Sequence, residues 1–318
     1  MVSAPEAPAV VIPSWNSAAL LPDCIASIRG QGLEVELMVV DNGSTDGSVA
    51  FLQREGIAHI TLPENIGFAA AVNLGIARTV ADSILVLNAD TVLESGSVER
   101  LVAALVADPG LGGVQPRLLQ LEDGARTVAA ARLYSAGMAL TADGRAFETG
   151  AGKEQAEEWL RPREVFGVCG AACLLRRALL TEVGGYDESY VSFYEDVDLN
   201  VRGQMRGWRF AYEPEAVVWH VGNASWTEGF TRPRAENARL VARNRLATQV
   251  KFMPVAAAPR IAAVEMAALV RAARERRFVA TFRGKLEALG RLRSLLAERR
   301  RLAAEGDVGR ARAWLGRP

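Results

Sequence analysis

The amino-acid sequence predicts an α/β fold in which a mostly parallel β-sheet is flanked by helices and followed by a helical C-terminal extension. Short apolar segments alternate with helical patterns along the first part of the chain, which is typical of βαβ units. From about residue 234 onward the chain is helical in pattern to its end. The 318 residues are 50% hydrophobic and 23% charged, which is an ordinary composition for a protein with a large buried core.

The spacing of apolar residues predicts the individual elements. The expected strands cover residues 9–13, 35–40, 57–62, 84–87 and 210–218, the last of them broken at Pro214, and residues 165–175 are apolar again. The expected helices pass through Leu21, Ile25 and Ile28 and cover residues 48–55, 67–79 and a segment from after Asp198 to about 206. Between residues 118 and 163 the sequence has no clear period, which favours loops and short strands.

The C-terminal region differs from the rest of the chain in charge. Residues 260–318 contain 15 Lys and Arg against 6 Asp and Glu, a net charge of +9, whereas residues 1–259 carry 22 against 31, a net charge of −9. Pro254 and Pro259 mark a break before this region. We therefore expect two domains, residues 1–255 and residues 256–318. In the second, leucines recur at helical spacing with arginines between them, which predicts a basic amphipathic helix through residues 286, 289, 292, 295 and 296.

The whole-chain composition excludes several classes of protein. The 37 basic and 37 acidic residues give a net charge of zero, so the charge does not indicate nucleic-acid binding. Cys24, Cys169 and Cys173 fit neither an even disulfide framework nor a zinc motif, and we expect reduced thiols in the core. Neither a signal peptide nor an apolar run of about 18 residues is visible. These observations predict a cytoplasmic protein.

Polar residues stand where the expected strands end. Asp41 ends one strand, and Asn88 and Asp90 end another. In open α/β sheets ligands bind at the carboxyl ends of strands, and a diphosphate ligand needs a divalent cation held by one or two carboxylates. Asp90 suits that purpose, although it could equally be a solvated turn residue. His220 leaves a strand into a loop of small residues and is either a metal ligand or structural.

An acidic cluster lies between aromatic residues further along the chain. Glu195, Asp196 and Asp198 follow Tyr194 and precede Leu199. Carboxylates in such surroundings can acquire a raised pKa or act as a base near a hydroxyl group. The alternative is a helix N-terminus, where acidic residues are favoured by the helix dipole. One site needing both a base and a helix cap would use all three.

Taken together in order, these segments resemble the family 2 glycosyltransferases with a GT-A fold. The resemblance is closest to the bacterial rhamnosyltransferase-like branch and covers about 220 residues. It rests on VVIPSWN at 10–16, VVDNGSTDGS at 39–48, NIGFA at 65–69, LNAD at 87–90, and the block that runs from GGYDE at 184–188 to YEDVDL at 194–199.

The resemblance implies a role for each matching residue. Asp41 would accept a hydrogen bond from a pyrimidine base. Asp90 would bind a metal as the last residue of the D-x-D motif, whose first acid is Asn88 here, and His220 would complete the metal site. Asp196 would be the catalytic base, with Glu195 beside it. The remaining donor contacts implied by the resemblance are Pro13, Trp15, Asn16, Ser44, Asp46, Asn65, Gly67, Phe68 and Asn73.

The implied activity is inverting transfer of a sugar, with rhamnose as the best candidate, from a UDP- or dTDP-sugar in the presence of Mg²⁺ or Mn²⁺. The acceptor would be a saccharide or a lipid-linked saccharide in cell-surface polysaccharide synthesis. The basic C-terminal helix would either contact the anionic inner face of the membrane or pack on the catalytic domain or on a second subunit of a homodimer.

Three other functions remain as alternatives. A glycoside hydrolase would use paired carboxylates, but Glu195 and Asp196 are adjacent and their side chains diverge. A sugar nucleotidyltransferase would need a Gly-rich phosphate loop near the N-terminus, which this sequence lacks. A non-catalytic nucleotide-sugar binder would not need Asp41, Asp90 and Asp196 together. The G-x-G-x-x-G, P-loop and G-x-S-x-G motifs are also absent.

Overall fold

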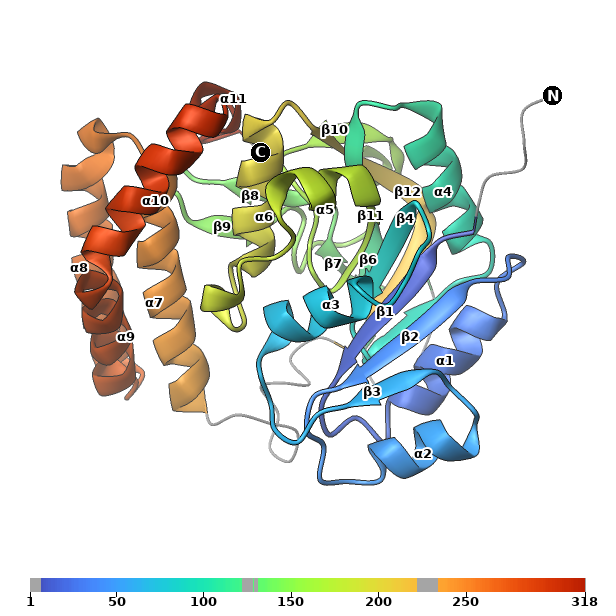
Figure 1. Ribbon diagram of the computed structural model, residues 1–318. Helices are drawn as coiled ribbons and strands as arrows, with labels where there is room; N and C mark the ends of the chain where they lie inside the picture. Colours follow the sequence, from blue (N-terminus) through green and yellow to red (C-terminus); the bar gives the residue numbers. More distant parts are fainter. Residues whose placement is uncertain (1–6, 122–127, 129–130, 222–233, 318) are drawn as a thin grey trace.

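The computed structural model describes residues 7–121, 128, 131–221 and 234–317 and confirms the predicted α/β fold (Figure 1). Twelve strands lie in the described part of the chain: β1 (Ala9–Ser14), β2 (Glu36–Asp41), β3 (His59–Thr61), β4 (Ser83–Leu87), β5 (Thr91–Leu93), β6 (Leu111–Gln120), β7 (Leu133–Ser135), β8 (Met138–Leu140), β9 (Ala146–Glu148), β10 (Arg163–Val165), β11 (Ala172–Arg176) and β12 (Arg209–His220). The helices of the α/β part are α1 (Leu21–Arg29), α2 (Ser48–Arg54), α3 (Phe68–Ile76), α4 (Ser97–Ala107), α5 (Arg177–Val183) and α6 (Glu195–Met205).

Ten of these strands form one sheet, whose main order is β10-β12-β6-β11-β4-β1-β2-β3. β1 pairs in parallel with β2 and β4, β2 with β3, and β6 with β12. Because β4 and β6 are both antiparallel to β11, the strands β1, β2, β3, β4, β6 and β12 all run in one direction. The ends of β1, β2, β4 and β12 therefore lie at the same edge of the sheet.

Helices cover both faces of this sheet (Figure 1). Along β1 the side chains alternate between two cores: Val10 and Ile12 join one, and Val11 joins the other. The first core includes residues of α1, α2 and α4, and the second includes residues of α3 and α5. Cys24, Cys169 and Cys173 are buried free thiols, as predicted.

Two predicted boundaries change. The helix expected after Asp198 begins at Glu195, because the chain turns into it through Tyr194, which has a left-handed backbone conformation. The strand expected to break at Pro214 runs unbroken from Arg209 to His220. Its ladder with β6 nevertheless shifts register between Glu213 and Val217, so the proline, which cannot donate to a ladder, is accommodated by an irregularity.

Five helices follow the sheet: α7 (Arg234–Phe252), α8 (Ala258–Arg274), α9 (Phe278–Gly290), α10 (Leu292–Glu305) and α11 (Val308–Arg312). The single amphipathic helix expected over residues 286–296 is wrong, because the chain breaks at Arg291 between α9 and α10, directly after Gly290. Helix α9 packs closely on α7, since a Cβ at Gly284 would collide with the Arg239 carbonyl oxygen.

The division of the chain into two domains, residues 1–255 and residues 256–318, remains a prediction. None of the described helices is long and apolar enough to cross a bilayer.

Candidate active site

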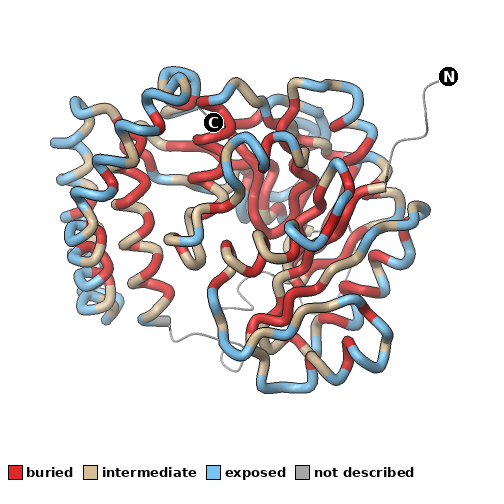
Figure 2. The backbone as a smooth tube through the Cα atoms, in the orientation of Figure 1, coloured by how far each residue is buried: buried red, intermediate tan, exposed pale blue. Residues whose placement is uncertain are grey.

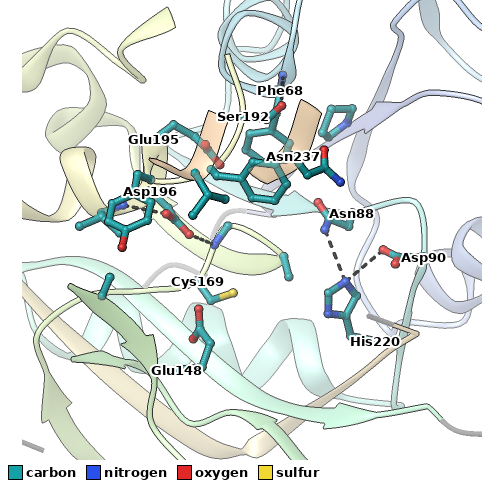
Figure 3. Close-up of a pocket in the computed structure, with 18 of the residues that line it drawn as sticks. Phe68, Asn88, Asp90, Glu148, Cys169, Ser192, Glu195, Asp196, His220 and Asn237 are labelled. Atoms are coloured by element: carbon teal, nitrogen blue, oxygen red, sulfur yellow. Dashed lines mark hydrogen bonds and ion pairs between the residues drawn. The ribbon is translucent and has the colours of Figure 1, made fainter. Parts of the chain in front are cut away.

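A cavity of about 460 Å³ opens where the strands of the sheet end (Figure 3). Four parts of the chain that are far apart in sequence line it. They are the end of β1 with Pro13 and Trp15, the segment after β4 with Asn88 and Asp90, the start of α6 with Glu195 and Asp196, and the end of β12 with His220. The alternation of parallel strands and helices thus brings the predicted residues to one place.

Asp41 occupies the end of β2 and is fully buried. Its Oδ2 accepts a hydrogen bond from the backbone N–H of Ser44 at 3.1 Å. Its Oδ1 is buried and has no hydrogen-bond partner among the described residues. A buried carboxylate oxygen without a donor is costly. Asp41 itself does not line the cavity, although the next residue, Asn42, does, and contact of Asp41 with a bound base remains a prediction.

Asn16, Ser44 and Asp46 do not line the cavity but join the two loops beside it. The Asn16 N–H donates to Ser44 Oγ at 2.8 Å, and Asn16 Oδ1 accepts from the Thr45 N–H at 2.8 Å. Asp46 accepts from the backbone N–H groups of Ala18 and Ser48 at 3.0 and 2.9 Å. These bonds fix the loop after β1 against the loop after β2. Direct contact of the three residues with a donor remains a prediction.

The segment before α3 also contributes to the wall. Asn65 and Phe68 line the cavity, and Asn65 Oδ1 accepts from the Gly67 N–H at 2.9 Å. Gly67 has a φ of +96°, and a Cβ there would lie 2.6 Å from the Val191 carbonyl oxygen, so only glycine fits. Asn73 lies outside the cavity and hydrogen-bonds both the N–H and the carbonyl of Tyr186 at 2.9 Å. It thereby links α3 to the segment that leads to α6.

Asp90 and His220 lie side by side at the cavity, as the metal hypothesis requires. His220 Nε2 is 3.2 Å from Asp90 Oδ1 and 3.5 Å from Asn88 Nδ2 (Figure 3). The His220 side chain is only 5% exposed, and the Asp90 side chain is 12% exposed. The Tyr134 ring packs edge-on against the imidazole, with ring centroids 4.4 Å apart, and holds it in place.

These residues fit a divalent cation that is shared with a substrate. One carboxylate and one imidazole leave several coordination positions for phosphate oxygens and water, which Mg²⁺ and Mn²⁺ retain readily. Among the described residues no group of three or more His, Cys, Asp and Glu side chains could hold an ion without such help. The small-residue loop after His220, residues 222–225, lies outside the described residues.

Asp196 lies in the first turn of α6, and backbone N–H groups fix its carboxylate. Its Oδ2 accepts from the Gly170 N–H at 2.9 Å, and its Oδ1 accepts from the Val197 N–H at 2.8 Å. Burial raises the pKa of Asp196 above its usual value, although these two hydrogen bonds oppose the shift. Both bonds orient the carboxylate without neutralising it. Glu195 precedes it and lines the cavity as well.

The loop before α6 has an unusual backbone that is held by α7. Val191, Phe193 and Tyr194 have positive φ angles of 66°, 70° and 69°, which is costly for residues with a Cβ. Asn244 of α7 is buried, and its Nδ2 lies 2.8, 2.8 and 2.7 Å from the carbonyl oxygens of Tyr190, Ser192 and Phe193. Two N–H groups thus serve three carbonyls, and α7 fixes the loop that presents Asp196.

Asp198 does not line the cavity, in contrast to Glu195 and Asp196. It forms buried ion pairs instead. Its carboxylate is fully buried and pairs with Arg202 Nε at 2.6 Å and with Lys251 Nζ at 2.5 Å. Lys251, in α7, also pairs with Asp187 at 3.0 Å and with Glu298 of α10 at 2.8 Å. Burial would lower the pKa of Lys251, but the surrounding carboxylates raise it, so it remains charged. Asp198 therefore joins α6 to the C-terminal helices.

One wall of the cavity consists of residues that were not predicted from the sequence. Tyr134, Met138, Glu148 and Cys169 line it, and three of them come from the region without a clear period between residues 118 and 163. Burial is the main reason why the pKa of Glu148 is raised to about 8, and the charge of Asp196 adds to it. The short strands β7, β8 and β9 are too brief to show a pattern.

Comparison with known proteins places the chain among glycosyltransferases. Residues 9–184 match the model of the family described as Glycosyl transferase family 2. The chain is 32% identical over 206 residues to N-acetylglucosaminyl-diphospho-decaprenol L-rhamnosyltransferase of Mycobacterium tuberculosis, which covers 58% of this chain and 66% of the relative. It is 33% identical over 217 residues to pre-mycofactocin glycosyltransferase of the same organism, which covers 66% of this chain and 42% of that relative. The chain therefore spans just under two thirds of one relative and less than half of the other.

Solved structures with low sequence identity share the fold. GalNAc-T7 with UDP, GalNAc and Mn²⁺ superposes with a TM-score of 0.59 at 15% identity, covering 77% of this chain and 48% of that protein. A mannosyltransferase from Pyrobaculum calidifontis in complex with GDP-Man and Mn²⁺ gives a TM-score of 0.51 at 20% identity, covering 93% and 85%. The predicted GT-A fold is thereby confirmed.

Proposed function

This chain belongs to glycosyl transferase family 2, and from that premise we propose that it is an inverting enzyme that moves a sugar from a nucleoside diphosphate to an acceptor hydroxyl. The observation that supports this most is that three groups with different tasks surround one cavity. They are the residues near Asp41 for the nucleotide, the pair Asp90 and His220 for the diphosphate, and Asp196 for the acceptor.

In this proposal Asp196 removes the proton from the acceptor hydroxyl as the hydroxyl oxygen attacks the anomeric carbon. The bond from that carbon to the diphosphate oxygen breaks on the opposite side, which inverts the configuration. A divalent cation bound by Asp90 and His220 would offset negative charge on the departing diphosphate. Asn88 takes the first position of the D-x-D motif that the resemblance implies, and it supplies an amide in place of a charge.

We assign rhamnose, carried by dTDP or UDP, as the transferred sugar because of the similarity to the rhamnosyltransferase. The acceptor is a saccharide or a lipid-linked saccharide of cell-surface polysaccharide synthesis, and the enzyme acts in the cytoplasm at the inner membrane face. Asp41 does not distinguish uracil from thymine, since both bases offer the same N3–H.

Donor binding tests the proposal directly. Thermal unfolding is measured with a panel of UDP- and dTDP-sugars, with and without Mn²⁺. One donor is expected to raise the unfolding temperature, because a ligand at a hundred times its Kd stabilises the native state by about 2.7 kcal/mol. Asp41→Ala should abolish most of this shift, whereas Asp82→Asn, at an exposed position remote from the cavity, should retain it. If no donor shifts the wild type, the proposal is wrong; binding without transfer to any acceptor would favour a non-catalytic binder.

The C-terminal helices carry an exposed surface that suits the proposed location. Ten of the fifteen large apolar side chains that are exposed among the described residues lie between Val255 and Leu296. Figure 2 shows that α8 and α9 are largely exposed on their outer side. The acids of this region are paired: Glu265, Glu287, Glu298 and Glu305 all form ion pairs. In contrast, six exposed arginines between the start of α8 and the end of α10 make no ion pair with any described residue: Arg260, Arg271, Arg274, Arg276, Arg293 and Arg300.

We propose that this surface, the exposed side of α8, α9 and α10, contacts anionic lipid. Apolar side chains beside unpaired arginines match a bilayer surface, where each arginine contributes about 1 kcal/mol. The protein is expected to sediment with vesicles of phosphatidylcholine and phosphatidylglycerol but not with phosphatidylcholine alone. The double variant Phe278→Ser, Phe282→Ser should bind at least about tenfold less tightly, because each buried phenylalanine contributes ~1.5–3 kcal/mol.

The control for this experiment is Val80→Ser, since Val80 is 86% exposed but lies outside the C-terminal helices. Light scattering measures the mass of the same proteins in solution. The surface would instead join two copies of the chain if the wild type is a dimer that does not bind anionic vesicles and the double phenylalanine variant is a monomer.

A further inference from the structure

Glu148 is an acid at the cavity that the proposed reaction does not use. It ends β9, where it pairs with Met138 of β8, and both residues line the cavity beside Cys169. Figure 3 shows its carboxyl group below Cys169, on the other side of the cavity from Glu195 and Phe68. A polar group at the wall of a sugar-sized cavity is placed to meet a ligand.

Glu148 lines the cavity, and two neighbouring side chains, Ser135 and Cys169, hydrogen-bond its carboxyl group. The Ser135 hydroxyl donates to Glu148 Oε2 at 2.5 Å. Ser135 Oγ in turn accepts from the Gly137 N–H at 3.1 Å, so the serine is itself fixed. A carboxylic acid that accepts at one oxygen can carry its proton on the other, and that O–H can donate to a ligand.

The surroundings keep Glu148 protonated at neutral pH. Burial raises its pKa to about 8, and the charge of Asp196 adds to the rise, whereas the hydrogen bonds from Ser135 and Cys169 oppose it. The titratable groups that face it are Asp196, Cys169 and Tyr134. Burial raises the pKa of both the Cys169 thiol and the Tyr134 hydroxyl, so those two remain neutral. On this wall Glu148 is thus the group whose charge changes just above neutral pH.

A neutral acid suits this place. The cavity must already hold the Asp196 carboxylate and, under the proposed function, a diphosphate. A second carboxylate would repel both, whereas a protonated acid contributes a hydrogen-bond donor without adding negative charge. The adjoining Met138 and Phe147 offer apolar contact to the carbon face of a sugar ring.

We propose that Glu148 binds a hydroxyl group of a sugar by donating a hydrogen bond from its protonated carboxyl, and that with Met138 and Phe147 it forms a sugar-binding wall. This inference rests on the proposed function. The sugar is either the one transferred or the one that accepts it. Both offer ring hydroxyls, and the two Michaelis constants distinguish them.

The test compares Glu148→Gln and Glu148→Ala with the wild type, using the UDP- and dTDP-sugar panel and nucleoside diphosphate release over a range of pH. Glutamine keeps a donor and cannot ionise. The wild type should lose activity as the pH rises through about 8, and Glu148→Gln should retain activity there. Glu148→Ala should lose about tenfold to a hundredfold in kcat/KM at neutral pH. A rise in the donor KM assigns the wall to the transferred sugar, and a rise in the acceptor KM assigns it to the acceptor.

Glu157→Gln is the matched control, since Glu157 is 81% exposed and lies away from the cavity. Thermal unfolding of every variant identifies loss of the fold, and Glu148→Gln keeps the test valid if Glu148→Ala does not fold. If Glu148→Gln loses activity at high pH as the wild type does, the inference is overturned. Wild-type kinetics in a folded Glu148→Ala would also overturn it. Either result counts against the inference even if the wild type transfers sugar normally. Absence of transfer by the wild type overturns the proposed function, and this inference with it.

Discussion

Replacement of Asp196 by Asn is expected to lower kcat by about 10²–10⁴, which is the usual contribution of a positioned general base. Asparagine retains the shape of the side chain and one of its acceptor oxygens, so α6 should begin as it does in the wild type. The Kd of the nucleotide-sugar donor should stay within a few-fold, because in the proposed reaction Asp196 acts on the acceptor. Single-turnover rates with saturating donor, together with donor titration by calorimetry, measure the two effects separately.

The pH dependence gives a second readout for the same residue. A base acts only when deprotonated, and burial raises the pKa of Asp196. Wild-type activity should therefore fall with acid at a pH above the ordinary range for aspartate, as the carboxylate becomes protonated. Asp82→Asn, an exposed exchange of the same kind, should match the wild type in both measurements. Wild-type turnover by Asp196→Asn would refute its assignment as the base.

Replacement of Lys251 by Met is expected to destabilise the protein by about 3–5 kcal/mol, the usual cost of leaving one partner of a buried ion pair behind. The Lys251 ammonium is fully buried between Asp198, Asp187 and Glu298. Without it, the buried Asp198 keeps only Arg202 as a charged partner. Methionine fills a similar volume, so the loss is electrostatic rather than a cavity effect. Urea unfolding followed by tryptophan fluorescence measures the free energy of unfolding.

Lys153→Met is the control for this prediction, because Lys153 is an exposed lysine whose ammonium group lies 5.3 Å from the centroid of the Trp159 ring. Its effect should be within about 0.5 kcal/mol. If Lys251→Met unfolds at the same urea concentration as this control, the buried network does not hold α6 to the C-terminal helices. Protonation of Asp187, whose pKa is lowered chiefly by Lys251 against the effect of burial, should weaken the same network in acid.

The residues that could be predicted from the sequence are those fixed by local pattern and parallel topology. Asp41, Asn88, Asp90 and His220 each end an apolar run, and parallel strands bring such ends together whatever lies between them. The meeting of Asn88, Asp90 and His220 at one cavity, with Asn42 next to Asp41 also in its lining, therefore followed from the alternation of strands and helices alone.

The residues that could not be predicted depend on contacts between distant segments. Asp198 stands in the same acidic run as Asp196, but its partner Lys251 lies 53 positions further along the chain. Glu148 lies in short strands whose pairing leaves no period. The break between α9 and α10 was missed because leucine spacing continued through it, and only Gly290 indicated that a helix could end there.

The contact of Asn244 with the loop at residues 190–193 limits how such an enzyme can be recombined in evolution. The family match ends at residue 184, yet the loop that presents Asp196 is secured from α7. If helices α7 to α11 were exchanged as a unit between two enzymes, the Asn244 amide that bonds the loop carbonyls would be lost. The positive φ angles of the loop would then no longer be stabilised. Helices α8, α9 and α10 lie beyond this contact and can therefore vary more freely, while α7 is inherited together with the sheet.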